Sequence, residues 1–221
     1  MGLLSVAKLY ASQSEPVCEI LKRCEDTCLQ GKALTSKFLT FASGGEPVRK
    51  RTPTVAYFKS TIDKLSKKLG ILPRYELSDD LWDIDIDKDQ FEVVLENILL
   101  NAKEAVESSD SPSSPVVVLV AGENVSMPIN GDNGGTIDDF VKISIVDNGP
   151  GIHPSELSKI FEPYYSTKKK SNEKGIGFGL TIAYSVMKRH HGLITAQSEL
   201  GKGTTINLFI PRAKECTLRC N

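Results

Sequence analysis

The sequence predicts an α+β fold, a two-layer sandwich of helices and mostly antiparallel strand pairs, with a helical arm in front of it. Three observations lead to this fold class. A helix-packing stripe stops at a Gly-Gly-Glu-Pro segment, a long amphipathic helix follows at residues 88–109, and helical and strand-like segments alternate on both sides of it. We therefore expect the arm at residues 1–46, the sandwich at residues 47–212 and a tail at residues 213–221.

The arm is expected to be a helical hairpin. Residues 3–13 are short and apolar, and Ser14-Glu15-Pro16 offers a cap followed by a proline. Side chains that can pack between helices then recur at intervals of three and four residues, namely Val17, Ile20, Cys24, Thr27, Gly31, Leu34, Phe38 and Phe41. Two interpretations stay open, a helix pair that packs on its own domain and an arm that dimerises.

Beyond the hinge at residues 43–47, each element is expected from its periodicity and its flanking residues. Asp87 is the expected N-cap of the long helix, with Gln90 at capping-box spacing. Residues 122–140 are rich in Gly, Asn and Asp and predict a long loop. Helices are expected at 54–69, 88–109, 155–161 and 179–190, and strands at 71–77, 82–86, 116–121, 141–146, 194–198 and 204–210.

Composition excludes several classes of protein. The 221 residues carry a net charge of -1, which argues against a broad nucleic-acid interface. The longest apolar run, residues 116–121, is far shorter than the roughly 18 residues of a membrane span. Five cysteines without a CxxC pair indicate neither a disulfide framework nor a zinc site, and Cys24 and Cys28 are expected to be small buried residues. With no signal peptide visible at the start, a reducing, cytoplasmic compartment fits best.

Two asparagines in the long helix need an explanation. Asn97, Asn101 and Glu104 lie on one stripe, separate from the apolar stripe of the same helix. Asparagine is a poor helix former because its amide competes for backbone hydrogen bonds. Either these amides are solvated, or their oxygens face a ligand or a hard cation.

The segment 147–151, Asp-Asn-Gly-Pro-Gly, directly follows a predicted strand. It has the composition of an ordinary turn. It would also suit a buried carboxylate with two glycines beside it, where a flat ring can approach the backbone. A carboxylate accepts a hydrogen bond from an exocyclic amine and repels a carbonyl oxygen, so Asp147 could select adenine over guanine.

A third segment combines glycines with lysines at the start of a predicted helix. Gly175, Gly177 and Gly179 alternate with Ile176 and Phe178, and Lys168, Lys169, Lys170 and Lys174 precede or flank them. Glycine-spaced amides at a helix N-terminus suit a polyphosphate, although a solvated basic loop is the plainer interpretation. The segment is not a Walker A loop, since the chain contains no GxxxxGK[ST].

Together and in this order, these segments resemble the ATP-binding catalytic domain of sensor histidine kinases, within the gyrase, Hsp90, histidine kinase and MutL superfamily. Residues 97–102 look like the N box and residues 147–151 like the DxGxG box. Residues 161–168 are similar to the F box, with Tyr-Tyr-Ser where Phe-Phe-Thr is usual. Residues 175–180 match the GxGxGL box, and Gly203-Thr204 the closing GT motif.

The resemblance implies a Bergerat ATP-binding fold, with three helices on a mixed sheet and a mobile lid at residues 162–178. Asn101 would ligate Mg²⁺ with support from Asn97, and Asp147 would accept from the adenine amine. Lys168 would hold phosphates and, with Asn97 and Asn101, serve catalysis. The whole expected ATP site comprises Asn97, Asn101, Glu104, Asp147, Gly149, Gly151, Ile152, Phe161, Lys168, Gly175, Gly177, Phe178, Gly179, Leu180 and Thr204.

One position separates the branches of this superfamily. In the members that hydrolyse ATP, a glutamate one turn before the metal asparagine activates water. This chain has Asn97 there, and an amide cannot take a proton at neutral pH. We therefore expect a phosphotransferase rather than an ATP-driven machine.

The expected phosphoacceptor histidine is missing. The three histidines, His153, His190 and His191, all lie in the ATP-binding half, and His191 stands where the family commonly has glycine. His190 and His191 end a helix, where a positive side chain suits the helix dipole, and are expected to be structural. The acceptor would fall at or just before Met1, so Met1 is interpreted as a fragment boundary; the alternative is a chain that works as an ATP sensor or phosphorylates a partner.

These features lead to one functional expectation. The chain would be the catalytic fragment of a sensor histidine kinase, using ATP and Mg²⁺ to phosphorylate a histidine on a dimerisation helix, for relay to an aspartate of a response-regulator receiver domain. The fragment alone would not phosphorylate itself, and it would form a homodimer through the arm if the arm is long enough. We expect no nucleic-acid or direct membrane contact, although the parent protein could be membrane-anchored. The alternatives are an inactive nucleotide-binding module or an ATP-hydrolysing member.

Overall fold

The computed structural model describes residues 17, 19–25, 28, 46–108, 115–129, 136–163, 165 and 177–214. It divides into two units, Met1–Glu46 and Pro47–Asn221. In the first unit residues 17, 19–25 and 28 are helical, and Val17 and Ile20 are 42% and 58% exposed. Cys24 and Cys28 are exposed as well, so the expectation that they are buried is wrong for the single chain. The rest of the expected hairpin lies outside the described residues.

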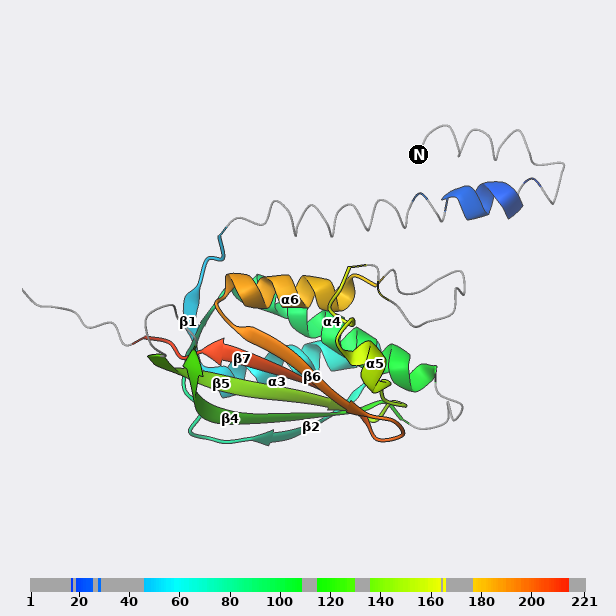
Figure 1. Ribbon diagram of the computed structural model, residues 1–221. Coiled ribbons are helices and arrows are strands. Elements are labelled where there is room, and N and C mark those ends of the chain that lie inside the picture. Colours follow the sequence, from blue (N-terminus) through cyan, green and yellow to red (C-terminus); the bar gives the residue numbers. More distant parts are fainter. Residues whose placement is uncertain are drawn as a thin grey trace, which may run out of the picture. The chain divides into compact units, whose positions relative to one another are not determined.

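The second unit is built on a five-stranded mixed sheet with the order β2-β4-β5-β7-β6 (Figure 1). The pair β2–β4 is parallel and the other neighbours are antiparallel. This arrangement confirms the predicted α+β sandwich with a mixed sheet. The strands are β2 (Leu72–Leu77), β4 (Val117–Ile129), β5 (Thr136–Asp147), β6 (Leu193–Glu199) and β7 (Gly203–Pro211).

Helices α3 (Thr54–Leu69), α4 (Lys88–Glu107) and α6 (Gly179–Arg189) cover one face of this sheet (Figure 1). Their apolar stripes enter one core, in which the largest fully buried side chains include Phe58, Phe91, Leu95, Ile143 and Met187. Helix α3 ends at Gly70, whose φ of 70° is the left-handed conformation that terminates helices. Among the described residues, no helix is long and apolar enough to cross a membrane.

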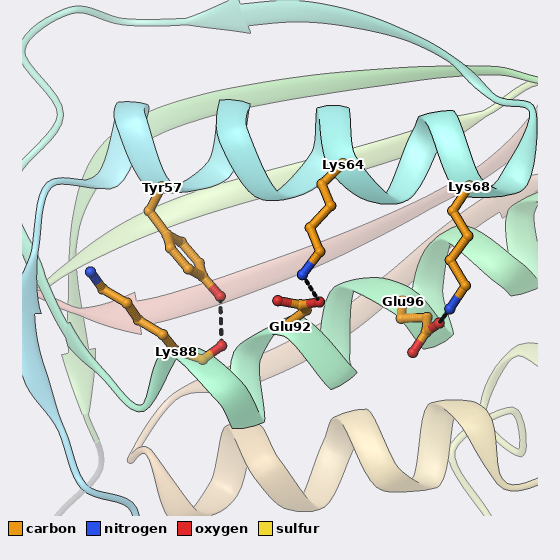
Figure 2. A network of polar contacts seen from close by, with 6 residues as sticks. All are labelled: Tyr57, Lys64, Lys68, Lys88, Glu92 and Glu96. Carbon is orange, nitrogen blue, oxygen red and sulfur yellow. Dashed lines mark hydrogen bonds and ion pairs between the residues drawn. The ribbon is translucent and has the colours of Figure 1, made fainter.

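Helices α3 and α4 are joined along their outer sides by polar contacts (Figure 2). The Tyr57 hydroxyl donates to the Lys88 carbonyl at 3.0 Å. Two ion pairs follow, Lys64–Glu92 at 2.6 Å and Lys68–Glu96 at 2.7 Å. Both pairs are largely exposed, so they add little to the stability that the apolar core provides.

The Asp87 side chain caps the start of α4 as predicted, but the backbone N–H of Asp87 has a different partner from the one expected. Asp87 Oδ1 accepts from the backbone N–H groups of Asp89 and Gln90. The capping box itself is wrong, because the Asp87 N–H donates to Nε2 of His190 and not to Gln90. Nε2 therefore carries no proton, and the other ring nitrogen, Nδ1, donates to the Val186 carbonyl.

His190 is thus structural, but it is not the positive helix-end charge that we expected. It is 1% exposed, and burial lowers the pKa of its imidazole, reinforced by the charges of Arg49 and Arg189; the Val186 hydrogen bond and the Asp87 charge oppose the shift. The neighbouring His191 adopts a φ of 57°, which explains why a glycine would also suit this position.

A small second sheet pairs β1 (Lys50–Thr52) with β3 (Ile84–Ile86) in antiparallel register. Strand β1 was not predicted, because three residues with two charges carry no readable alternation. Just before β1, Val48 N–H donates to Asp87 Oδ2 at 3.0 Å, and the Arg49 side chain donates to the Arg189 carbonyl at 3.2 Å. Hydrogen bonds therefore join the residues after the hinge to Asp87, the N-cap of α4, and to Arg189 in the last turn of α6.

Strands β4 and β5 form a hairpin that is much longer than expected. Their register runs without a break from Val118↔Asp147 to Ile129↔Thr136. Most of the loop predicted at residues 122–140 is therefore strand, and only residues 130–135, which hold the NGDNGG run, separate the two strands. The prediction failed because cross-strand pairing can hold polar residues such as Glu123 and Ser126 in a ladder.

The helix predicted at residues 155–161 is also shorter in the structure. Helix α5 covers Pro154–Leu157, with the His153 side chain accepting from Ser155 N–H as the N-cap. Turns with bonds three residues apart, such as Glu162 N–H to the Lys159 carbonyl, continue the segment. The apolar spacing that predicted seven helical residues is satisfied by these turns.

Candidate functional site

A pocket lies between the C-terminal half of α4, the ends of β5 and β7 and the start of α6. Six of the predicted site residues line this pocket, Asn101 among them. The distant segments that carry them therefore meet in the folded chain, while the ligand stays a prediction. Five apolar residues complete its wall and were not predicted as site residues. The lining consists of Ile98, Asn101, Ala102, Ala105, Ile145, Asp147, Gly151, Ile152, Leu180, Thr204 and Ile206.

Asp147 is the charged group of this pocket. It ends β5 and is 9% exposed. Its Oδ1 accepts from the N–H of Gly149 at 2.8 Å and from the N–H of Thr204 at 3.2 Å. Burial raises the pKa of the carboxyl, and the two backbone hydrogen bonds partly oppose that shift. Among the described residues no donor bonds to Oδ2, so an ionised Asp147 offers that oxygen to a ligand.

The glycines around Asp147 are required by the protein's own packing. A Cβ on Gly149 would lie 2.8 Å from Asp147 Oδ1, and a Cβ on Gly151, at a φ of +76°, would lie 2.2 Å from the Glu199 carbonyl oxygen. At Gly203, with a φ of +101°, a Cβ would lie 2.0 Å from the Asp147 carbonyl oxygen. The sequence suggested room for a flat ring at Gly149 and Gly151, whereas the structure shows close backbone contacts that hold Asp147 in place.

A residue that sequence reasoning missed connects these segments. Ser198, near the end of β6, accepts from Ile152 N–H at 2.8 Å and donates to the Gly203 carbonyl at 2.8 Å. Its Oγ also lies 3.0 Å from Oγ1 of Thr204. No periodicity or motif distinguishes this serine from the other polar residues of its strand; only its place just before the Gly201–Gly203 turn could have drawn attention to it.

The two asparagines of α4 face the start of α6. Asn97 is 9% exposed, and its Nδ2 donates to the Val93 carbonyl at 2.8 Å. A Cβ on Gly179 would lie 3.2 Å from Asn97 Oδ1 and 3.3 Å from Asn101 Nδ2. The solvated alternative is therefore wrong for Asn97. Both amides lie beside a helix N-terminus, where unpaired backbone N–H groups favour anions.

The other predicted site residues lie around the pocket or outside the described chain. Glu104 is half-buried and is not part of the lining. The Phe161 carbonyl accepts from the Thr181 hydroxyl at 3.1 Å, and its ring packs 6.0 Å from that of Tyr184. Gly177 has a φ of 75° and Phe178 is the N-cap of α6. Lys168, Gly175 and most of the lid at residues 162–178 lie outside the described residues.

Comparison with known proteins agrees with this geometry. Residues 86–214 match the family described as histidine kinase-, DNA gyrase B- and HSP90-like ATPase. The chain belongs to this family. The resemblance that the motifs carry is thereby confirmed, and the matched segment contains α4, β4 to β7 and every residue of the pocket.

The curated relatives include sensor kinases and sporulation kinases. The chain is 35% identical over 136 residues to sensor kinase CckA of Brucella abortus, covering 62% of this chain and 14% of that protein. It is 28% identical over 220 residues to sporulation kinase E of Bacillus subtilis, covering 98% of this chain and 26% of that protein. The chain thus spans about a seventh to a quarter of the relatives' length, and it contains a catalytic ATP-binding domain of the sensor histidine kinase type.

Solved structures show the same fold. Full-length ShkA, in complex with AMPPNP, superimposes with a TM-score of 0.62 at 22% identity, over 96% of this chain and 43% of that one. The mycobacterial sensor histidine kinase MprB superimposes with a TM-score of 0.54 at 21% identity, over 75% of this chain and 98% of that one. At these identities the likeness concerns the fold.

Proposed function

We propose that the pocket binds ATP and that the chain transfers the γ-phosphoryl group to a histidine on a dimerisation helix of a sensor histidine kinase. The observation that carries the proposal is the buried Asp147 carboxylate, whose Oδ2 has no donor among the described residues and which lies in a pocket with a mostly apolar lining. A buried charge without a full set of partners is costly, and a ligand with an N–H donor relieves that cost.

The adenine base fits this environment. Its exocyclic amine would donate to Asp147 Oδ2, while Ile98, Ala102 and Ile206 provide apolar surface for the ring. A guanine carbonyl at the same place would meet the carboxylate oxygen and be repelled. Asp147 and Thr204 thus form the base site, and Gly149, Gly151 and Ile152 hold its shape.

The phosphates would extend from the base site toward the start of α6. Asn97 and Asn101 lie beside Gly179 there, and we assign phosphate contacts to these amides and to the N–H groups of Gly177 and Gly179. Leu180 lines the pocket. As the family resemblance implies, we propose that Leu180 contacts the nucleotide together with Phe161, Lys168, Gly175, Phe178 and Glu104.

The residues present also fit Mg²⁺. No cluster of three His, Cys, Asp or Glu side chains occurs among the described residues, but Mg²⁺ commonly takes only one or two protein oxygens and completes its shell with phosphates and water. The Asn101 amide, supported by Asn97, offers such an oxygen at the phosphate end of the pocket. When bound, Mg²⁺ neutralises charge on the phosphate oxygens.

The chemistry asked of the chain is positioning. Phosphoryl transfer requires the γ-phosphoryl group to be held in line with the attacking nitrogen, and it needs little covalent help from the protein. Asn97, at the place where the hydrolysing branch has a glutamate, donates its amide N–H to Val93 and cannot act as a base toward water. The arrangement therefore favours transfer to a histidine over hydrolysis.

The partners follow from the same proposal. The acceptor histidine would be on a dimerisation helical hairpin, and the phosphoryl group would pass to an aspartate of a response-regulator receiver domain. The exposed apolar residues Val17 and Ile20 of the arm suit a homodimer contact. Of the chain's own histidines, His190 is buried and structural, which supports the expectation that the chain does not phosphorylate itself on histidine.

Phosphotransfer to a supplied acceptor tests the proposal. The chain is incubated with Mg²⁺, γ-labelled ATP and a helical hairpin from a related sensor kinase that carries its acceptor histidine. We expect phosphohistidine on the hairpin and none on the chain, with Asn101→Ala abolishing the transfer. Rapid phosphate release without the hairpin would favour the ATP-hydrolysing alternative. ATP binding without any transfer would favour the inactive nucleotide-binding module.

A further inference from the structure

We propose that Ser198 is a positioning residue for base selection, because its hydroxyl fixes the direction in which the Thr204 hydroxyl points its hydrogen. The inference rests on the proposed nucleotide function and adds a residue that neither the family motifs nor the pocket lining contains. Ser198 is half-buried on β6, and its contacts reach the loop after Asp147 and the first two residues of β7, Gly203 and Thr204.

The Ser198 hydroxyl makes three polar contacts. A hydroxyl has one hydrogen and two acceptor lone pairs. The hydrogen of Ser198 goes to the Gly203 carbonyl at 2.8 Å, and one lone pair accepts from Ile152 N–H at 2.8 Å. The remaining contact, 3.0 Å to Thr204 Oγ1, can therefore only be one in which Thr204 donates.

This assignment decides what Thr204 offers to the pocket. Its single hydrogen is committed to Ser198, so Oγ1 has only lone pairs left for a ligand. Thr204 lines the pocket beside Asp147, to which its own N–H donates at 3.2 Å. The base site is then acceptor-only on two neighbouring side chains, and it favours an amine at the bound edge of the base over a carbonyl.

Without Ser198 the Thr204 hydroxyl would be free to rotate. It could then donate to a carbonyl oxygen on the base, and the penalty against such bases would fall. Ile152 N–H and the Gly203 carbonyl would also lose a partner, but those losses affect the stability of the fold and not the choice between amine and carbonyl. Base discrimination therefore separates the positioning role from a purely structural one.

The test compares ATP with ITP, in which a carbonyl replaces the 6-amine of adenine and the neighbouring N1 carries a hydrogen. Dissociation constants are measured by calorimetry with Mg²⁺ for the wild-type chain and for Ser198→Ala. We expect the wild-type chain to prefer ATP, and the ITP-to-ATP ratio of dissociation constants to fall about tenfold in the variant, as expected for one redirected hydrogen bond.

Three further single variants and one double variant serve as controls. Ser144→Ala is the matched control, since Ser144 is another half-buried strand serine, bonded to Asn207 at 2.7 Å, and does not line the pocket; its ratio should stay at the wild-type value. Ser198→Thr keeps the hydroxyl and should keep the ratio. Thr204→Val should lower the ratio, and adding Ser198→Ala to it should lower the ratio no further.

The outcomes distinguish this inference from the proposed function. A wild-type chain that binds neither nucleotide would contradict the proposed function itself. Suppose that the wild-type chain binds ATP and that Ser198→Ala leaves the ITP-to-ATP ratio of dissociation constants unchanged, because both affinities stay the same or fall equally. That result would refute the role of Ser198 and leave the proposed function standing. Should the alanine variant fail to fold, Ser198→Cys carries the same test, because a thiol is a weak acceptor for the Thr204 hydrogen.

Discussion

Asp87 and Asp147 lie near opposite ends of α4, and both accept hydrogen bonds from two backbone N–H groups through Oδ1. They differ in the second carboxylate oxygen. Asp87 Oδ2 accepts from Val48 N–H, and the backbone N–H of Asp87 donates to His190 Nε2. Asp147 Oδ2 has no donor among the described residues, and Asp147 lines the pocket.

The comparison shows how one helix can serve two purposes. At the Asp87 end, hydrogen bonds connect Val48 and Arg49 with Asp87, Arg189 and His190. We call this group of residues the joint, and its role is structural. At the Asp147 end, acceptors remain available in an apolar surrounding, and the result is a binding site. Changes at the joint should therefore alter stability without altering nucleotide binding, whereas removal of the Asp147 side chain should alter nucleotide binding more than stability.

The largest effect is expected where the pocket is built on a backbone contact. Gly203→Ala places a Cβ about 2.0 Å from the Asp147 carbonyl oxygen at a positive φ, so the backbone must move. We expect the free energy of unfolding to fall by about 3–5 kcal/mol, measured by urea denaturation.

The matched control is Gly201→Ala in the same turn. Gly201 has a φ of +79°, but no atom lies within 4 Å of the place that its Cβ would take, so only the conformational cost of about 1–2 kcal/mol applies. Equal losses for the two variants would show that the contact with Asp147 is unimportant.

Removing the capping carboxylate should give the next largest effect. Asp87→Ala leaves the N–H groups of Val48, Asp89 and Gln90 without their acceptor, and we expect a loss of about 2 kcal/mol of unfolding free energy. The affinity for ATP should stay within about twofold of the wild-type value in calorimetry. A large loss of affinity with intact stability would break the distinction between joint and pocket.

The joint should also respond to acid. The pKa of His190 is lowered in the folded chain, so between the unfolded value of 6.5 and the folded value the unfolded chain binds more protons. Stability is therefore full above pH 6.5 and falls as the pH drops toward the folded pKa. His190→Gln, whose amide oxygen can still accept from Asp87 N–H, should lack this part of the decline in denaturation curves recorded from about pH 7.5 to about pH 5.5.

The smallest effect is expected on the outer side of α3 and α4. Replacing Glu92 and Glu96 by Gln removes both ion pairs of Figure 2, which are exposed to solvent. We expect Tm to change by less than about 2 °C, measured by circular dichroism. A larger fall would mean that these pairs, and not the buried core, fix α3 against α4.

The sequence was sufficient for the elements whose signals are local. The apolar stripe of α4, its cap at Asp87 and the order of the motifs predicted the helix, the fold class and the family. The length of the β4–β5 hairpin and the strand β1 were missed, because pairing with a distant strand supplies what three residues or a mixed polar ladder do not show locally.

The site residues that carry a local sequence signal were predictable as well, and those defined by distant contacts were not. Asn97 and Asn101 were found because asparagine is unexpected in a helix interior. Asp147 was found because two glycines follow it in a segment that resembles the DxGxG box of the family. Ser198 and His190 were not assigned their contacts, since each depends on residues far away in sequence, and nothing in a β-strand serine or a helix-end histidine indicates a partner. The glycine contacts likewise depend on backbone segments that meet only in the folded chain.

One calorimetric experiment tests the central claim most directly. The purified chain is titrated with ATP and with GTP in Mg²⁺, beside an Asp147→Ala variant whose fold is checked by thermal denaturation. The account predicts binding of ATP but not GTP, and a loss of ATP affinity of about 100-fold in a variant that is still folded. Equal binding of both nucleotides, or undiminished ATP binding in the folded variant, would contradict it.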